Sequence, residues 1–136
     1  MAAYPITEIS GIDTELATAF KSVGIRTTSG LLEAAKNPKG RKQLSAKIGV
    51  SEKNILGWAN MADRMRIKGV GEEYASLLQA AGVDTVKELK YRNPAKLAQA
   101  MAVANAKRKL VRVLPSDQAV ERWIDQAKRL QLKITY

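Results

Sequence analysis

The sequence predicts a compact all-α protein of about eight short helices, forming two similar units within one domain that spans residues 1–136. Three observations predict this class. Apolar residues recur at helical intervals, as in Leu16, Phe20 and Val23, and no segment alternates convincingly with a period of two. Glycine, proline and capping residues divide the chain into segments of helical length. The chain also resembles itself at a fixed offset, which indicates a duplicated supersecondary unit.

The helices are expected near residues 14–23, 28–36, 38–48, 51–66, 72–81, 85–92, 94–104 and 117–131. Sequence signals for helix starts, each a capping side chain or a proline at the first position, occur at Asn37-Pro38, at Asn93-Pro94, at Thr85 with Glu88 as a capping box, and at Pro115-Ser116-Asp117. Gly24 and Gly82 suit the left-handed position that ends a helix.

The duplication has an offset of 58 in its first part, where residues 9–32 match 67–90, and of 65 in its last, where 55–67 match 120–132. Repeats are therefore expected at about 7–66 and 67–136, with seven extra residues within 105–116 of the second copy. Trp58 matches Trp123, and both are expected in the core rather than as stacking surfaces for nucleotides. Because the first copy lacks a preceding helix, helix 117–131 is expected beside the first hairpin, within the chain or on a neighbouring subunit. The second arrangement would give self-association through the C-terminal helix.

The composition removes most catalytic mechanisms. The chain has no Cys and no His, and its acids share no motif with metal-ligand spacing. We therefore expect no enzyme, metal or cofactor; a divalent-metal nuclease built only from carboxylates is the alternative. No apolar run reaches the length of a membrane span and the first residues lack a secretion signal, so a cytoplasmic location without a membrane partner is expected.

The charge favours a partner rich in phosphates. Lys and Arg number 23 against 13 acids, a net charge of +10. Nucleic acid is preferred to anionic lipid because the amphipathic segments carry small, Ala-rich faces. Residues 87–112 contain a single acid, Glu88, and eight cations: Lys87, Lys90, Arg92, Lys96, Lys107, Arg108, Lys109 and Arg112. A second cluster, residues 36–47, carries five cations and no acid. Either cluster can instead be an ordinary solvated face.

Residues 67–78, IKGVGEEYASLL, resemble the helix-hairpin-helix motif, which has an apolar residue, Gly-apolar-Gly and then a helix with Ala near its start. Here Gly69 and Gly71 permit the turn, Val70 fills the space between the helices, and Ala75 allows their close approach. The whole chain is similar to an uncharacterised group of bacterial tandem helix-hairpin-helix domains. The first copy departs from the pattern, since Asp13 replaces the second glycine.

The resemblance implies that the hairpin amides bind a backbone phosphate of DNA, often with a monovalent cation on the hairpin carbonyls. Unpaired amides at the positive end of a helix dipole provide a physical basis for anion binding. In this reading the amides from Val70 to Glu72 are the donors, and a basic loop extends the contact. The candidate site comprises Lys68, Gly69, Val70, Gly71, Glu72, Lys107, Arg108, Lys109 and Arg112.

The first-turn acids Glu72 and Glu73 would compete with an incoming phosphate, and Asp13 occupies the equivalent position in the first copy. One working hairpin, the second, is therefore expected. The expected function is non-enzymatic, largely sequence-independent binding of nucleic acid, DNA more than RNA, with a nucleoid association. The alternative is a protein-interaction or self-assembly module on the same scaffold, with Gly-Val-Gly serving only to connect two helices.

Overall fold

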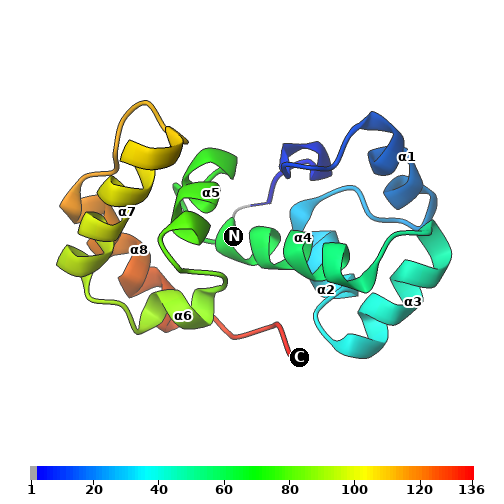
Figure 1. Cartoon of the computed structure of the whole chain (residues 1–136). Helices are drawn as coiled ribbons and strands as arrows, with labels where there is room; N and C mark the ends of the chain where they lie inside the picture. The colour runs from blue at the N-terminus through cyan, green and yellow to red at the C-terminus, as the bar shows by residue number, and fades with distance from the viewer. Residues whose placement is uncertain (1–2) are drawn as a thin grey trace.

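The prediction of an all-α fold is confirmed. The computed structural model describes residues 3–136, and this range contains eight α-helices, one short 3-10 helix and no strand (Figure 1). The elements are η1 (Ile6–Glu8), α1 (Thr14–Ser22), α2 (Thr28–Ala34), α3 (Pro38–Ile48), α4 (Glu52–Arg64), α5 (Glu72–Ala80), α6 (Val86–Lys90), α7 (Pro94–Arg108) and α8 (Asp117–Arg129).

Three of the four predicted helix starts are capped as expected. The side chains of Asn37, Asn93 and Ser116 accept hydrogen bonds from amides in the first turns of α3, α7 and α8 at 2.8, 3.1 and 3.1 Å. The prediction of a capping box at Thr85 is wrong, because its side chain accepts no hydrogen bond from the first turn of α6. The Thr85 hydroxyl donates to the Glu88 carboxylate instead, and the amide at the start of α6 goes to a buried acid of α4.

The helices form two halves that share α4 (Figure 1). In the first half α4 packs on α2 and α3, and in the second half α8 packs on α6 and α7. The C-terminal end of α4 then leads into the second hairpin and packs against α5. The two halves therefore have the same order of elements, and α4 is continuous with both.

The backbone of the two hairpins follows the same path at an offset of 58. The amide of Ile12 donates to the carbonyl of Ile9 at 3.1 Å, and that of Val70 donates to Ile67 at 3.0 Å. The first glycine of each hairpin, Gly11 or Gly69, has a positive φ, +94° and +93°. An L side chain rarely adopts this conformation, so the turn requires glycine at that position in both copies.

The position of the last helix differs from the expectation. Helix α8 packs within the second half rather than beside the first hairpin. A Cβ added to Gly69 would lie 3.5 Å from the indole nitrogen of Trp123. Helix α4 occupies the equivalent place in the first half, where a Cβ added to Gly11 would lie 3.2 Å from the Trp58 indole nitrogen. Each half therefore closes on its own last helix, and self-association through α8 is not needed to complete the first.

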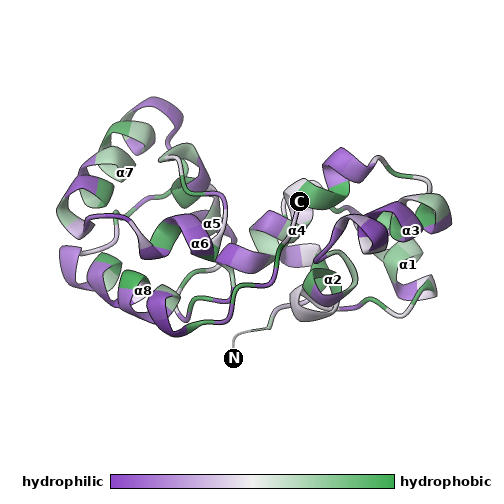
Figure 2. Ribbon diagram, turned by 90° about the horizontal axis from the view of Figure 1, so that it is seen from below, coloured by the Kyte–Doolittle hydropathy of each residue, from purple (hydrophilic) through white to green (hydrophobic). Residues whose placement is uncertain are grey.

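The C-terminal tail, residues 130–136, is the segment that returns to the first half (Figures 1 and 2). The Thr135 amide donates to the Lys36 carbonyl at 2.7 Å, and the Thr135 carbonyl accepts from the buried guanidinium of Arg41 at 2.7 Å. Lys133 pairs with Glu33 at 3.3 Å. The tail thus joins α8 to the loop between α2 and α3.

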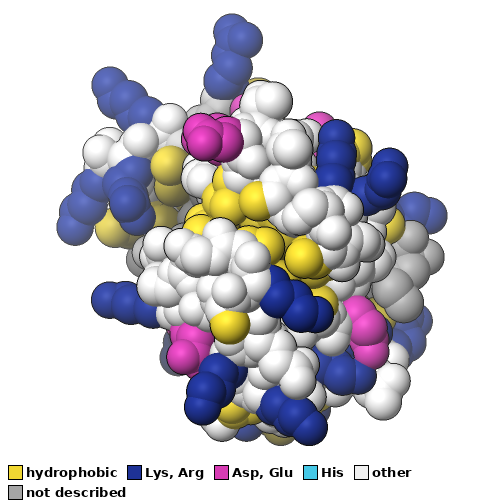
Figure 3. Space-filling model, turned by 90° about the vertical axis from the view of Figure 1, so that its right-hand side faces the viewer, with side chains coloured by type: hydrophobic (Ala, Val, Ile, Leu, Met, Phe, Trp, Pro, Cys, Tyr) yellow, Lys and Arg dark blue, Asp and Glu magenta, His cyan; other side chains and the backbone are white. Residues whose placement is uncertain are grey.

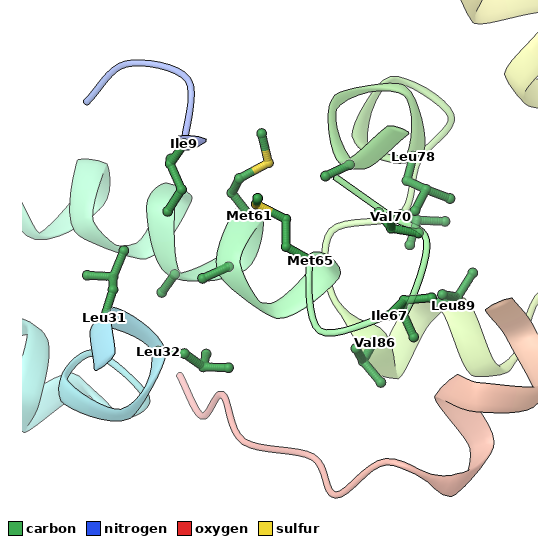
Figure 4. Close-up of a cluster of buried hydrophobic side chains, with 14 of the residues drawn as sticks. Ile9, Leu31, Leu32, Met61, Met65, Ile67, Val70, Leu78, Val86 and Leu89 are labelled. Atoms are coloured by element: carbon green, nitrogen blue, oxygen red, sulfur yellow. The ribbon is translucent and has the colours of Figure 1, made fainter. Parts of the chain in front are cut away.

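The hydrophobic core runs without interruption through both halves. In Figure 4 side chains of the first half, such as Leu31, are followed by Met61 of α4 and Met65 just after it, and then by the second-half residues Ile67 and Val70. All five are at most 6% exposed. The helices are amphipathic, with hydrophobic and hydrophilic positions alternating along α7 and α8 (Figure 2). The core holds the second hairpin at the junction of the two halves.

Candidate nucleic-acid interface

The second hairpin has the shape that its sequence predicts. Val70 is fully buried between the helices and Ala75 is fully buried in the first turn of α5, while Lys68 and Gly69 are exposed. Gly71 is the residue before α5, and its backbone is extended, with φ −91° and ψ −164°. The hairpin therefore exposes its backbone at the glycines and buries its one apolar side chain.

The hairpin donors differ from the expected set. The Val70 amide is taken by the Ile67 carbonyl, and the Lys68 amide donates to the Gln126 side chain of α8 at 3.0 Å. In the described chain, the amides of Gly71, Glu72 and Glu73 make no hydrogen bond. The free donors thus begin one residue later than expected, and Val70 contributes packing rather than an amide.

The hairpin carbonyls are largely used by the protein. The Val70 carbonyl accepts from the Tyr4 hydroxyl at 3.4 Å, the Lys68 carbonyl accepts from Gln126 at 3.4 Å, and the Ile67 carbonyl accepts from the Val70 amide. A cation at the hairpin would have to compete with these donors for most of its ligands. The geometry is therefore a poor fit to the monovalent cation that the resemblance implies.

The two hairpins differ at the start of the following helix. In the first, the Asp13 carboxylate caps α1 by accepting from the Leu16 amide at 2.8 Å. In the second, Gly71 offers no side chain, and α5 has no side-chain cap. The start of α5 carries its own two acids, the half-buried Glu72 and the exposed Glu73. Within residues 3–136, both hairpins leave three amides without a hydrogen bond, and the second also leaves the amide of Tyr74, the counterpart of Leu16, without a cap. The second hairpin presents these donors beside two carboxylates.

The segment after α7 lies against the first turn of α5. The Tyr74 hydroxyl donates to the Val113 carbonyl at 3.0 Å. The ring of Tyr74 also packs on Trp123, with centroids 5.4 Å apart. Residues 109–115 are thereby held next to the start of the helix that follows the second hairpin. This contact joins residues 39 positions apart and has no counterpart in the sequence pattern.

Helix α7 is one turn longer than predicted, so Lys107 and Arg108 belong to its last turn rather than to a loop. It ends at Arg108, and the next residue, Lys109, has a φ of +50°. The Asn105 amide group then bonds to both the carbonyl and the amide of Val111, at 3.1 and 3.0 Å. Val111 is buried, so the segment carrying the three consecutive cations is anchored at both ends.

The eight cations between Lys87 and Arg112 are not neutralised by the protein. Three ion pairs form within residues 3–136, and none involves this group. They are Lys36–Glu33, Lys133–Glu33 and Arg66–Asp63. Lys107, Arg108, Lys109 and Arg112 are all exposed. Arg92 is half-buried and donates to the Ala81 carbonyl at 3.2 Å. These eight side chains, here termed the cationic flank, are distributed from α6 to the loop after α7 and carry charge that forms no ion pair among the described residues.

The second cluster, residues 36–47, is weaker than its composition suggests. Arg41 is buried and donates to two backbone carbonyls, and Lys36 pairs with Glu33 at 2.6 Å. Three exposed lysines of α3 remain: Lys39, Lys42 and Lys47. Figure 3 shows this side of the molecule, where cationic side chains surround a central group of hydrophobic atoms. The cationic flank of the second half is therefore the better candidate surface.

A buried charged network was not predicted. The Asp63 carboxylate accepts hydrogen bonds from the Arg66 guanidinium and from the Val86 amide, both at 2.8 Å. Arg66 also donates to the Gln131 carbonyl. Arg64 is 2% exposed and donates to the carbonyls of Ala75 and Asp84, and burial lowers its pKa to about 10. These groups hold the hairpin, α6 and the tail together. The sequence of residues 60–67 alone does not show that Asp63, Arg64 and Arg66 are buried rather than exposed to solvent.

Other kinds of site find no support in the part of the chain that the structure describes. There, no three acids lie together as metal ligands would. No helix in the same range has both the length and the apolar composition required to cross a membrane.

The geometry defines an all-α protein whose two halves each contain a glycine hairpin and end in a Trp-bearing helix. A model of the family described as Domain of unknown function (DUF4332) matches residues 10–130, and the chain belongs to that family. Comparisons with curated proteins and with solved structures find no match.

Proposed function

We propose that this protein binds the backbone of nucleic acids, DNA in preference to RNA, without catalysis and without reading base sequence. The observation that carries the proposal is the cationic flank: eight cations with one nearby acid in the sequence and no ion pair in the structure. Such a surface neutralises phosphates and releases their counterions, which is the main source of sequence-independent affinity. A cytoplasmic, nucleoid-associated location follows from the proposal.

The start of α5 adds a second contact within the same half. Its free amides and the positive end of its dipole favour an anion, and the Tyr74–Val113 hydrogen bond places the α7 loop beside it. Glu72 and Glu73 oppose that contact, so the flank supplies most of the attraction. A phosphate at Gly71 then fixes the orientation of the backbone rather than the overall affinity.

The test is fluorescence anisotropy with a labelled random-sequence duplex at two salt concentrations. The triple variant Lys107→Glu, Arg108→Glu, Lys109→Glu should bind at least about tenfold more weakly, with a log-log salt slope smaller by about 2.7. The matched control is Lys39→Glu, Lys42→Glu, Lys47→Glu on α3, which changes the net charge by the same amount at exposed positions of the first half.

The control variant should bind nearly as well as the unmodified protein. Equal losses in the two triple variants would indicate attraction by net charge alone and contradict an assignment to the flank. If the unmodified protein does not bind nucleic acid and light scattering shows oligomers that depend on concentration, the fold is a self-assembly module and the proposal fails.

A further inference from the structure

We infer that the groove between α5 and α7 receives unstacked bases, so that the protein prefers single-stranded nucleic acid to duplex. This inference rests on the proposed function and adds a class of substrate to it. The groove has a volume of about 470 Å³. Its floor is formed by Ala80 and Ala81 from the end of α5 and by Ala100, Val103 and Ala104 from α7.

The rim of the groove carries positive charge at both ends. Lys96, Lys107 and Arg108 line it, Gln99 adds an amide, and no acid is among the lining residues. Lys96 and Lys107 lie eleven residues apart on one helix, or about 16 Å along its axis. That length allows several consecutive phosphates of a strand to follow the rim while their bases point at the floor.

The floor suits flat apolar surfaces. Alanine methyl groups give it little relief, and Val103 is 53% exposed, which is unusual for a valine in a helix of this core. A single strand offers free base faces together with its phosphates, whereas a duplex keeps its base faces stacked inside. The combination of apolar floor and cationic rim therefore matches a single strand better than a duplex.

An exposed aromatic ring is carried by the loop that leads from α6 into α7. Tyr91 is 74% exposed, and the ammonium of Lys90 sits 5.0 Å from its ring centroid. The next residue, Arg92, donates to the carbonyl of Ala81, which lines the groove. The Cα atoms of Tyr91 and Lys96 can be at most about 18 Å apart along the chain. A strand leaving the groove at Lys96 can therefore stack a base on Tyr91 within a few nucleotides.

An acidic amphipathic helix is the rival occupant. Helix-in-groove recognition depends on large apolar anchors entering a deep apolar groove. Here the floor is mainly alanine and no large aromatic or leucine side chain lines it. The rim would attract acidic side chains as well as phosphates, so charge alone does not separate the two, and the shallow floor favours the single strand.

The experiment compares three labelled probes by anisotropy: a mixed-sequence single strand, its duplex, and an abasic strand with the same phosphates. The single strand should bind at least about tenfold more tightly than either of the others. Val103→Glu and Tyr91→Ala should each reduce the ratio of single-strand to duplex affinity by about tenfold. The matched controls are Ala46→Glu at an exposed position of α3 and Tyr136→Ala, whose ring is 69% exposed in the tail.

The outcomes separate this inference from the proposed function. Equal affinity for single strand, duplex and abasic strand, unaffected by Val103→Glu, would overturn the inference and leave backbone binding intact. Absence of binding to all three would overturn both. Tighter binding of a Glu/Leu amphipathic helical peptide, lost in Val103→Glu and displacing the single strand, would assign the groove to a protein partner.

Discussion

One residue separates the two hairpins in what they can bind. Asp13 and Gly71 occupy equivalent positions with similar extended backbones, φ −81° and ψ −179° for Asp13 against φ −91° and ψ −164° for Gly71. The Asp13 carboxylate caps α1 by accepting from the Leu16 amide, whereas Gly71 has no side chain and leaves the equivalent amide of Tyr74 without a partner in the described part of the chain. A Cβ added at Gly71 would meet no atom within 4 Å.

Gly71→Asp should therefore increase stability while weakening nucleic-acid binding. The carboxylate can cap α5 as Asp13 caps α1, and the loss of glycine restricts the unfolded chain, which together should raise the free energy of unfolding by about 0.5–1 kcal/mol. It would also place a negative charge where a phosphate would approach, a repulsion of about 1 kcal/mol at 4 Å in water, or about a fivefold loss of affinity.

Urea denaturation and anisotropy with a duplex measure the two effects separately. The control is Asp13→Asn, which keeps an acceptor for the Leu16 amide but removes the charge of the first hairpin. That variant should not bind more weakly than the unmodified protein. An unchanged affinity in Gly71→Asp would show that the start of α5 does not contact the ligand.

The helices themselves were largely predictable, because their signals are local. Asn37, Asn93 and Ser116 cap the helices that they precede, and Gly24 and Gly82 have positive φ at the ends of α1 and α5. Helix α7 passes its expected end because Asn105 bonds beyond the helix, to Val111, and does not interrupt it.

The placement of the elements was less predictable. The matching of Trp58 with Trp123 identifies equivalent positions but not the hairpin that each packs beneath, and the expectation that α8 returns to the first hairpin within the chain was wrong for this reason. Contacts between side chains and distant backbone also leave no periodic signal. Three such contacts shape the candidate site: Tyr74 with Val113, Gln126 with Lys68, and Asp63 with Val86.

Deletion of residues 131–136 should destabilise the protein by about 3 kcal/mol. Arg41 and Arg66 are buried and would each lose a backbone acceptor, at Thr135 and Gln131 respectively. A hydrogen bond to a charged group contributes about 1.5–3 kcal/mol, and some of this is recovered when water reaches the vacated site. Denaturant unfolding measures the change. Removal of Tyr136 alone, an exposed residue, should have little effect. A truncated chain as stable as the whole one would show that the tail only rests on the surface.

At the scale of the whole molecule, the two halves are joined in three ways. The core passes through α4 into the second hairpin, Tyr4 reaches the Val70 carbonyl, and the tail returns from α8 to α2 and α3 (Figures 1 and 4). The halves therefore share buried surface and buried charges. Separation would leave Met65 and Ile67, both fully buried, open to water.

We therefore expect the two halves to unfold together, and each carries its own reporter. Trp58 packs on Phe20 in the first half, and Trp123 packs on Tyr74 in the second. In Trp123→Phe the fluorescence follows the first half, and in Trp58→Phe it follows the second. Within each variant, urea transitions by fluorescence and by far-UV circular dichroism should coincide, because partial unfolding would expose the shared core. A fluorescence midpoint displaced from the dichroism midpoint in either variant would show that one half folds without the other.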